Sequence, residues 1–288
     1  MKQKRMVIYS SLGCGAVAIV ICVVALYYMM QLKYTQVVFL NVGQGDATLI
    51  AQGTHQILID GGADGVVLQE ELGRHMPFWD RTIDIVVATH PDSDHIDGLV
   101  SIFKNYTVHQ FWHTEAGKDT SQYVALMHMA HREEGMEDVL VRNGVETHLA
   151  DYANVKVVYP FTAQNDAYSK DVNDESIAMI VTIGGEKFYL GGDLPTEYED
   201  ILPIDTEVTV LKASHHGSQK STSELFLNKL HPRDVVISVG KDNRYGHPHK
   251  DVIDRFMSSN ANIYRTDENG TIEYRCDDHA CQLFLQKQ

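Results

Sequence analysis

The stretch from Thr89 to Gly98 constrains this chain more than any other part of its sequence. It places two histidines and two aspartates, at positions 90, 92, 94 and 95, within six residues. The mainly apolar run 83–88 precedes it, so the pattern predicts a buried strand that ends in a polar loop. Imidazole and carboxylate groups are preferred ligands of divalent metals, and neighbouring carboxylates repel each other without a cation. The loop therefore indicates a metal site rather than a solvated acidic turn.

Three further polar clusters also follow strand-like runs. Asp193 comes after the run 186–190, His215 and His216 come after 208–212, and His247 follows 234–239 at a short distance. Each cluster alone is weak, because a Gly-Asp pair is usually a turn and a His-His pair often lies on the surface. Strands of one sheet bring their ends to a common edge, so loops that are distant in sequence can converge there. Together the four clusters predict one site.

With these motifs the chain resembles the metallo-β-lactamase fold superfamily. Within it, the sequence looks most like the hydrolase domain of the ComEC-type competence DNA-uptake protein and its free-standing relatives. The resemblance covers roughly residues 35 to 275, and its matching stretches are 41–50, 58–62, 90–98, 173–177, 192–193, 211–218, 244–248 and 265–272. It implies a mixed α/β (α+β) fold, an αββα sandwich in which helices cover the outer faces of two packed sheets.

Two departures from the superfamily pattern bear on the chemistry. The superfamily usually carries His-x-His-x-Asp-His, whereas Asp92 stands here at the second histidine, as in the ComEC-like branch. Lactamases and glyoxalases carry a third histidine motif between the positions of His95 and Asp193, and Asn173 and Ser176 occupy that stretch in this chain. Both departures argue against a true β-lactamase.

The resemblance and the ligand chemistry imply a hydrolase that uses one or two divalent ions, zinc or manganese, and a metal-bound hydroxide. The expected metal ligands are His90, Asp92, Asp94, His95, Asp193, His215 and His247. Asp92, Asp94 and His216 are expected to take part in catalysis. His216 is also an alternative to His215 as ligand, and His216 or His249 could protonate the leaving oxygen. Substrate or outer-shell contacts are expected from Asp46, Asp60, Asn173 and Ser176, although Asp60 could equally be a plain turn residue.

The expected substrate is a phosphodiester, either DNA or a small or cell-wall phosphodiester. One alternative is a hydrolase of carboxylic esters, thioesters or lactams on the same fold. Another is a non-catalytic domain that binds a partner, and the sequence does not identify protein partners. The formal net charge is −15, and no stripe rich in Lys and Arg is visible. This composition disfavours tight non-specific binding of long nucleic acid, which depends on neutralising phosphates.

The N-terminal segment predicts a membrane anchor. Residues 6–30 carry no charged side chain, and at ~1.5 Å per residue a helix of this length spans a bilayer. Basic residues dominate 1–5, so the positive-inside rule makes 1–5 a cytoplasmic stub and 6–30 a single-pass transmembrane helix. The hydrolase domain, 34–288, is then extracytoplasmic, at the cell membrane. A cleaved signal peptide is the main alternative, but the run is long and no small-x-small cleavage site follows it.

The remaining pattern predicts the secondary structure of the domain. Strands are expected at 36–40, 46–50, 56–59, 83–88, 155–159, 177–183, 187–190, 208–212, 235–239, 262–266, 271–275 and 282–285. Helices are expected at 65–75, 97–104, 121–134, 222–230 and 249–258. Cys276 and Cys281 flank the turn of the last hairpin. Cross-strand neighbours are close enough for a disulfide, which would persist outside the cytoplasm; two free thiols are the alternative.

Overall fold

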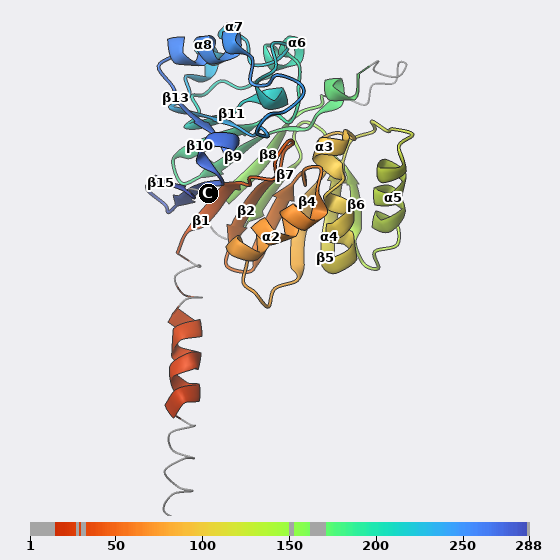
Figure 1. The fold of residues 1–288 in the computed structure, drawn as a ribbon, viewed down its shortest axis with the longest axis vertical. Coiled ribbons are helices and arrows are strands. Elements are labelled where there is room, and N and C mark those ends of the chain that lie inside the picture. Colours follow the sequence, from red (N-terminus) through yellow and green to blue (C-terminus); the bar gives the residue numbers. More distant parts are fainter. Residues whose placement is uncertain (1–14, 27–28, 30–32, 150–152, 162–170, 287–288) are drawn as a thin grey trace, which may run out of the picture.

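The computed structural model describes residues 15–26, 29, 33–149, 153–161 and 171–286. In this part of the chain, two β-sheets pack face to face, and helices cover their outer faces (Figure 1). The arrangement is the expected mixed α/β sandwich of the metallo-β-lactamase type. Its N-terminal and C-terminal halves each supply most of one sheet together with the helices on it.

The first sheet has eight strands in the described residues. Their spatial order is β15 (Cys281–Leu285), β14 (Ile272–Cys276), β1 (Thr35–Phe39), β2 (Thr48–Gln52), β3 (His55–Ile59), β4 (Thr82–Val87), β5 (Thr107–His113) and β6 (Glu137–Leu140). Strands β3 to β6 run parallel to one another. The helices of this half are α2 (Gly65–His75), α3 (Ser93–Ile96), α4 (Leu99–Asn105) and α5 (Ser121–Ala130).

The second sheet has seven strands in the described residues. Their spatial order is β13 (Asn262–Arg265), β12 (Asp234–Ile237), β11 (Val210–Lys212), β10 (Glu186–Leu190), β9 (Ala178–Ile183), β8 (Ala153–Tyr159) and β7 (Glu146–Leu149). Strands β10 to β13 run parallel. The helices are α6 (Thr196–Glu199), α7 (Glu224–Leu230), α8 (Lys250–Ser258) and α9 (Thr266–Asn269), with 3-10 turns η1 (Val172–Glu175) and η2 (Ser214–Gly217).

Three apolar layers hold the sandwich together. One lies between the sheets, and in β4 it receives Ile85 and Val87. A second layer packs the other face of β4, through Ile83 and Val86, against the helices of the first half. A third lies between the second sheet and its helices. Because β4 is covered on both faces, it reads as a nearly continuous apolar run rather than an alternating one.

Parallel strands of both sheets end at the edge where the sheets meet α3 and η2. The segments that follow β3, β4, β10 and β11 therefore lie close together, although β3 ends at Ile59 and β11 at Lys212. Three of the four expected polar clusters lie in these segments, and the fourth, with His247, follows β12. The polar segment 89–98, expected as a loop, contains the short helix α3, so that Asp94 and His95 lie on a helix.

Several expected elements differ from those observed. Strands β5, β6 and β7 were absent from the expectation, since they carry exposed polar side chains between short apolar positions. The helix expected at 97–104 begins at Leu99, and that expected at 121–134 ends at Ala130. The strand expected at 46–50 begins at Thr48, so Asp46 lies in the preceding loop.

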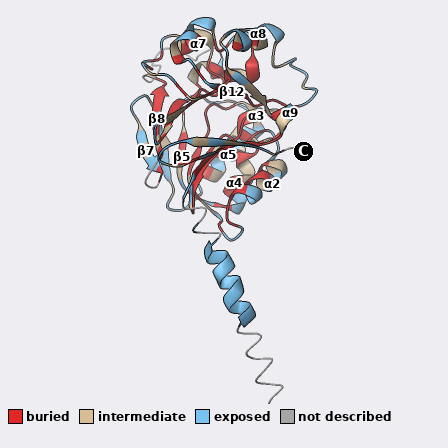
Figure 2. Ribbon diagram, turned by 90° about the vertical axis from the view of Figure 1, so that its left-hand side faces the viewer, coloured by how far each residue is buried: buried red, intermediate tan, exposed pale blue. Residues whose placement is uncertain are grey.

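The anchor expected at 6–30 is only partly covered by the described residues. Residues 15–26 form a helix with exposed side chains (Figure 2). No helix in the described ranges is long and apolar enough to cross a bilayer. The rest of the expected anchor, at 6–14, 27–28 and 30, lies outside those ranges, so the transmembrane helix stays a prediction.

Candidate metal centre

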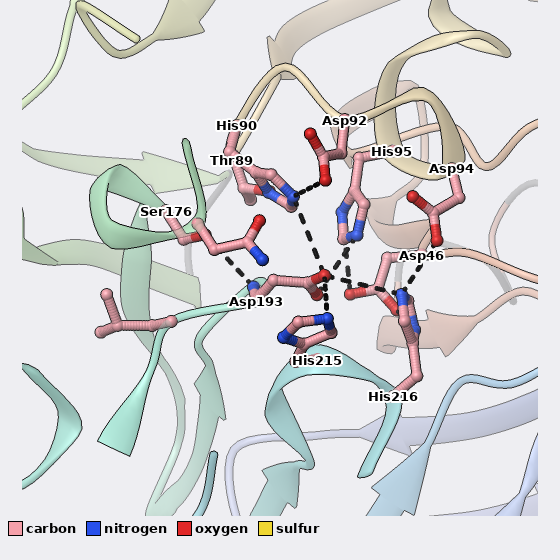
Figure 3. A network of polar contacts seen from close by, with 12 residues as sticks. Asp46, Thr89, His90, Asp92, Asp94, His95, Ser176, Asp193, His215 and His216 are labelled. Carbon is pink, nitrogen blue, oxygen red and sulfur yellow. Dashed lines mark hydrogen bonds and ion pairs between the residues drawn. The ribbon is translucent and has the colours of Figure 1, made fainter. Parts of the chain in front are cut away.

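Carboxylates and imidazoles from both halves of the sandwich meet at the shared edge of the sheets (Figure 3). The first half contributes Asp46 from the β1–β2 loop, Asp60 after β3, and the segment from His90 to His95 after β4. The second half contributes Asp193 after β10 and the two histidines of η2 after β11. Asp92, Asp94 and His215 are partly exposed and the other carboxylates and imidazoles are buried, so the buried charges interact strongly.

Asp193 occupies the middle of this cluster. Its Oδ1 lies 3.2 Å from His95 Nε2. Its Oδ2 lies 3.7–3.8 Å from three further Nε2 atoms, those of His90, His215 and His216. Four imidazoles thus surround this carboxylate, as Figure 3 shows. A carboxylate in this position can bridge two cations.

The ligand atoms form two groups that could each hold an ion. In one group those of His90, His95 and Asp193 lie within 4.8 Å of one another, and in the second so do those of Asp94, His95 and His216. Asp46 joins two further groups of this kind, one with Asp60 and His95 and one with Asp193 and His216.

The polar atoms that face the centre lack hydrogen-bond partners. They are Nε2 of His90, His95 and His216 and Oδ1 of Asp193, all buried. A buried polar atom without a partner is costly, and native structures rarely leave one. One or two divalent cations would satisfy these atoms, so the residues fit a metal with mixed nitrogen and oxygen ligands, such as zinc or manganese.

Asp60 orients two of the three imidazoles. Its Oδ2 accepts hydrogen bonds from His95 Nδ1 and Thr89 Oγ1, both at 2.7 Å, and its Oδ1 accepts from the Thr89 N–H at 2.8 Å. The Thr89 hydroxyl donates to Asp60, so its oxygen can accept from His90 Nδ1, which lies 3.1 Å away. Both imidazoles therefore use Nδ1 for these hydrogen bonds and turn Nε2 toward Asp193.

The structure separates the roles of His215 and His216. His216 Nδ1 donates to the Ser238 carbonyl at 2.9 Å, and its Nε2 lies 3.3 Å from Asp94 Oδ2. His216 is fully buried, whereas the His215 side chain is a quarter exposed. The ligand geometry therefore favours His216, which the sequence analysis held as the alternative to His215. His215 lies at the rim of the centre.

The backbone of η2 explains why adjacent histidines can point into different places. His215, His216 and Gly217 all have positive φ, at 52°, 54° and 80°. Two consecutive non-glycine residues in this region are strained, and such strain is concentrated at functional sites. As a result the planes of the two imidazole rings are 84° apart.

The electrostatics of the buried imidazoles differ. Burial and the neighbouring His95 lower the pKa of His90 to about 3, so this imidazole is neutral. Burial also acts to lower the pKa of His216, but the carboxylates of Asp193 and Asp46 raise it to about 10. Burial would raise the pKa of Asp193, but His95 and His216 hold it well below its usual range. The carboxylate is therefore ionised and ready to bind a cation.

Lys212 is a functional residue that the sequence analysis missed, because it lies at the end of an apolar strand. Its Nζ forms a buried ion pair with Asp46 Oδ2, and Asp46 Oδ1 lies 3.3 Å from His216 Nδ1. Burial would raise the pKa of Asp46, but Lys212 and His216 lower it to about 2. The loop with Asp46 can approach α3 because residue 45 is glycine: a Cβ there would lie 2.0 Å from the Asp94 carbonyl oxygen.

Other expected site residues lie around the centre. Asp92 Oδ2 lies 4.0 Å from His90 Nε2, but its other oxygen is ion-paired with Lys118, and Asp92 belongs to none of the described ligand groups. Ser176 Oγ accepts a hydrogen bond from the Asp193 N–H at 3.3 Å. Asn173 is buried in η1, with an Oδ1 that has no hydrogen-bond partner.

His247 and His249 form an outer layer next to η2. The ring of His247 lies 5.5 Å from that of His215 and 6.3 Å from that of His216, and His249 lies 5.0 Å beyond it. Burial and the nearby His216 lower the pKa of His247 to about 4, so this imidazole is neutral. His247 is absent from the ligand groups found among the described residues.

The two packed sheets with outer helices, and the polar loops at their shared edge, are those of the metallo-β-lactamase superfamily fold. Residues 55–221 match the model of the β-lactamase superfamily domain, and the chain belongs to this family. It is 31% identical over 262 residues to ComE operon protein 3 of Bacillus subtilis, covering 83% of this chain and 33% of that protein. It is 26% identical over 269 residues to Recombination protein 2 of Haemophilus influenzae, covering 91% and 31%. The chain thus spans about a third of the length of these relatives.

Solved structures share the fold at low sequence identity. The metallo-β-lactamase fold protein YhfI from Bacillus subtilis aligns with a TM-score of 0.54 and 12% identity, over 80% of this chain and 95% of that one. A diphosphatase from the PhnP family aligns with a TM-score of 0.50 and 15% identity, over 85% and 99%. At these identities the likeness concerns the fold alone.

Proposed function

We propose that this domain is a metal-dependent phosphodiesterase. The observation that carries the proposal is the position of Asp193, between the buried and unpartnered Nε2 atoms of His90, His95 and His216. A divalent ion bound there supplies Lewis acidity and a nucleophile at neutral pH. The alternative of a non-catalytic domain is less favourable, because a binding module has no need of so many buried ionisable groups in one place.

The residues of this chain divide into three tasks in the proposed reaction. His90, His95 and Asp193 would hold one cation, and Asp94 and His216 would hold a second. Asp60 and Lys212 hold these ligands in place through the hydrogen bonds and ion pair described above. His215 lies at the exposed rim with its Nε2 3.8 Å from Asp193 Oδ2, where it can donate a proton to the leaving oxygen.

The ligand set and the relatives support a phosphodiester over an ester or lactam. Asp92 and Asn173 stand where lactamases have histidines. The relatives are named for competence and recombination, which makes DNA a candidate substrate. The net charge of −15 weighs against long nucleic acid as a tightly bound ligand.

We further propose that the domain works outside the cytoplasm, anchored in the cell membrane by residues 6–30. The uncharged N-terminal run supports this location. The disulfide between Cys276 and Cys281 agrees with it, since such bonds persist mainly in oxidising compartments.

The test uses the full chain, purified without chelator. Its metal content is measured, and its hydrolysis of bis-p-nitrophenyl phosphate, p-nitrophenyl acetate and a chromogenic cephalosporin is compared with added Mn²⁺ or Zn²⁺. We expect metal-dependent turnover of the phosphodiester and its loss in the His90→Ala/Asp193→Ala variant. Faster turnover of the acetate or the cephalosporin would favour the ester or lactam alternative. Bound metal without any turnover would favour a binding domain.

A further inference from the structure

A groove of about 830 Å³ opens beside the metal centre. Residues 115–119 and α5 form one wall, where Tyr123 and Met127 contribute apolar surface, and Val172 of η1 lines the other. Tyr123 and Met127 also line a small void with His90, which places the groove next to the metal ligands. Its volume is in the range of about 300–1,000 Å³ that is typical of small-molecule sites.

One positively charged side chain, that of Lys118, lies between this groove and the metal centre. Lys118 lines the groove, and its Nζ is ion-paired with Asp92 Oδ1. The other oxygen of Asp92 lies 4.0 Å from His90 Nε2, which is itself 3.8 Å from Asp193. The side chain of Lys118 is 40% exposed, so it can exchange its partner at little cost, unlike the buried Lys212 on the other side of the centre.

The charged side chains along the groove limit which substrate groups can bind in it. Its lining includes the carboxylates of Glu115, Asp119 and Glu175 against the single amine of Lys118. Arg142 pairs with Glu115 at 2.6 Å, so two acidic side chains of the lining have no basic partner in the described contacts. A phosphate next to Lys118 is attracted, but a second phosphate further along the groove would be repelled.

We propose that this groove binds one ester group of the phosphodiester, that Lys118 binds the phosphoryl oxygens, and that Asp92 is the counter-ion of Lys118 rather than a metal ligand. The inference rests on the proposed function and narrows its substrate class. The substrate is a diester with one small, partly apolar ester group that carries no further phosphate, and a polynucleotide strand does not fit this groove. The substrate phosphate replaces Asp92 as the partner of Lys118, since charge-assisted bonds to phosphate are strong.

The first test compares Lys118→Met and Lys118→Arg in the metal-loaded full chain, with Lys104→Met as the control. Lys104 is an exposed lysine near the end of α4 that does not line the groove. We expect Lys118→Met to raise KM for bis-p-nitrophenyl phosphate by about tenfold or more, with unchanged metal content. Lys118→Arg keeps the cation and should stay within about threefold of the wild type. Equal KM values for Lys118→Met and wild type would overturn the proposal.

The Asp92→Asn variant tests whether Asp92 is the counter-ion of Lys118 or a metal ligand. If Asp92 only holds Lys118, the variant keeps its full metal content and binds substrate at least as well, because Lys118 is released. Loss of one metal equivalent in Asp92→Asn, with Lys118→Met still fully loaded, would show that Asp92 is a ligand and overturn this part of the proposal.

Two further measurements test the role of Lys118 and the size of the ester group separately from phosphodiesterase activity as such. Inorganic phosphate is titrated into the metal-loaded protein, and we expect it to raise Tm in the wild type but not in Lys118→Met. This readout stands even if no phosphodiester is turned over, which would refute the proposed function alone; an equal Tm shift in both proteins would refute the role of Lys118. A short oligothymidylate is then compared with the small diester, and a higher kcat/KM for the oligonucleotide would overturn the limit on the ester group.

Discussion

Asp60 Oδ2 lies 2.7 Å from His95 Nδ1 and so holds this imidazole from behind the metal centre. The same carboxylate reaches His90 through Thr89. The Asp60 N–H donates to the Val87 carbonyl at 2.8 Å, which ties the end of β3 to the end of β4. One side chain therefore orients two candidate ligands, and these hydrogen bonds favour an orienting role for Asp60 over that of a plain turn residue.

Replacing Asp60 by alanine should lower metal affinity and phosphodiester turnover by about 10- to 100-fold, because both imidazoles lose their orientation. The measurement is a metal titration against a chromophoric chelator. Asp64→Ala is the control, since Asp64 caps the start of α2 and its loss costs only helix stability. Metal affinity in Asp60→Ala equal to that in Asp64→Ala would contradict the orienting role.

His215→Ala and His216→Ala should differ in metal content. His216 belongs to the ligand groups with Asp94 and Asp193, so its loss should remove about one equivalent of metal and abolish turnover. His215→Ala should keep the metal of the wild type and lose turnover by about 10²- to 10⁴-fold, the usual contribution of a general acid. Metal analysis by atomic emission and single-turnover kinetics check both. A loss of metal in His215→Ala alone would return the ligand role to His215.

Metal binding should become tighter as pH rises. The carboxylates of Asp193 and Asp46 outweigh the effect of burial and raise the pKa of His216 to about 10, so the metal-free protein holds a proton on this imidazole at neutral pH. A metal ligand must release that proton, and below the pKa each pH unit should strengthen binding by about tenfold per proton released. Dissociation constants between pH 6 and 8.5 check this. Binding that does not change over this range would show that His216 is already neutral.

Buried Glu199 should make stability fall between weakly acidic and neutral pH. Burial raises its pKa from 4.5 to about 7, although Ser214, Thr222 and Tyr189 donate hydrogen bonds to it. The folded protein thus keeps a proton that the unfolded chain loses above pH 4.5. The contribution of Glu199 to the free energy of unfolding is largest below about pH 4.5, declines up to about pH 7 and is constant above that. The total change is on the order of 3 kcal/mol. Urea unfolding at pH 5 and 8 should show a smaller difference in Glu199→Gln than in the wild type.

The sequence alone could predict that the candidate ligands lie close together, but not which role each of them has. Polar clusters that follow apolar runs are a local signal, so the segments with His90, Asp193 and His216 could be assigned to one edge of the sheets. The choice between His215 and His216 depends on three consecutive left-handed residues, which no local pattern reveals. Lys212 looked like the polar end of an apolar strand, and its partner Asp46 is 166 positions away.

The missed strands have a similar cause. In β5, His109 and Gln110 are exposed or half-buried next to the buried Phe111 and Trp112, so the strand shows neither a continuous apolar run nor a regular alternation. The contact of Lys118 with Asp92 joins the β5–α5 loop to the metal-binding motif across 26 positions. Such contacts depend on tertiary packing, which the periodicity of apolar residues along the sequence does not reveal.

The disulfide should stabilise the last hairpin without affecting catalysis. Cys276 and Cys281 are paired in register between β14 and β15, and Cys276 also pairs with Thr35, at the end of β1 remote from Asp46. The turn between the two cysteines packs on Gly184, where a Cβ would lie 2.9 Å from the Asp278 carbonyl oxygen. Closing so short a loop restricts the unfolded chain by about 2 kcal/mol. The Cys276→Ser/Cys281→Ser variant should lose about this much in urea unfolding yet keep wild-type kcat and KM, and the reduced wild type should match it. A drop in kcat with unchanged stability would mean that the hairpin contributes to the site rather than to the fold.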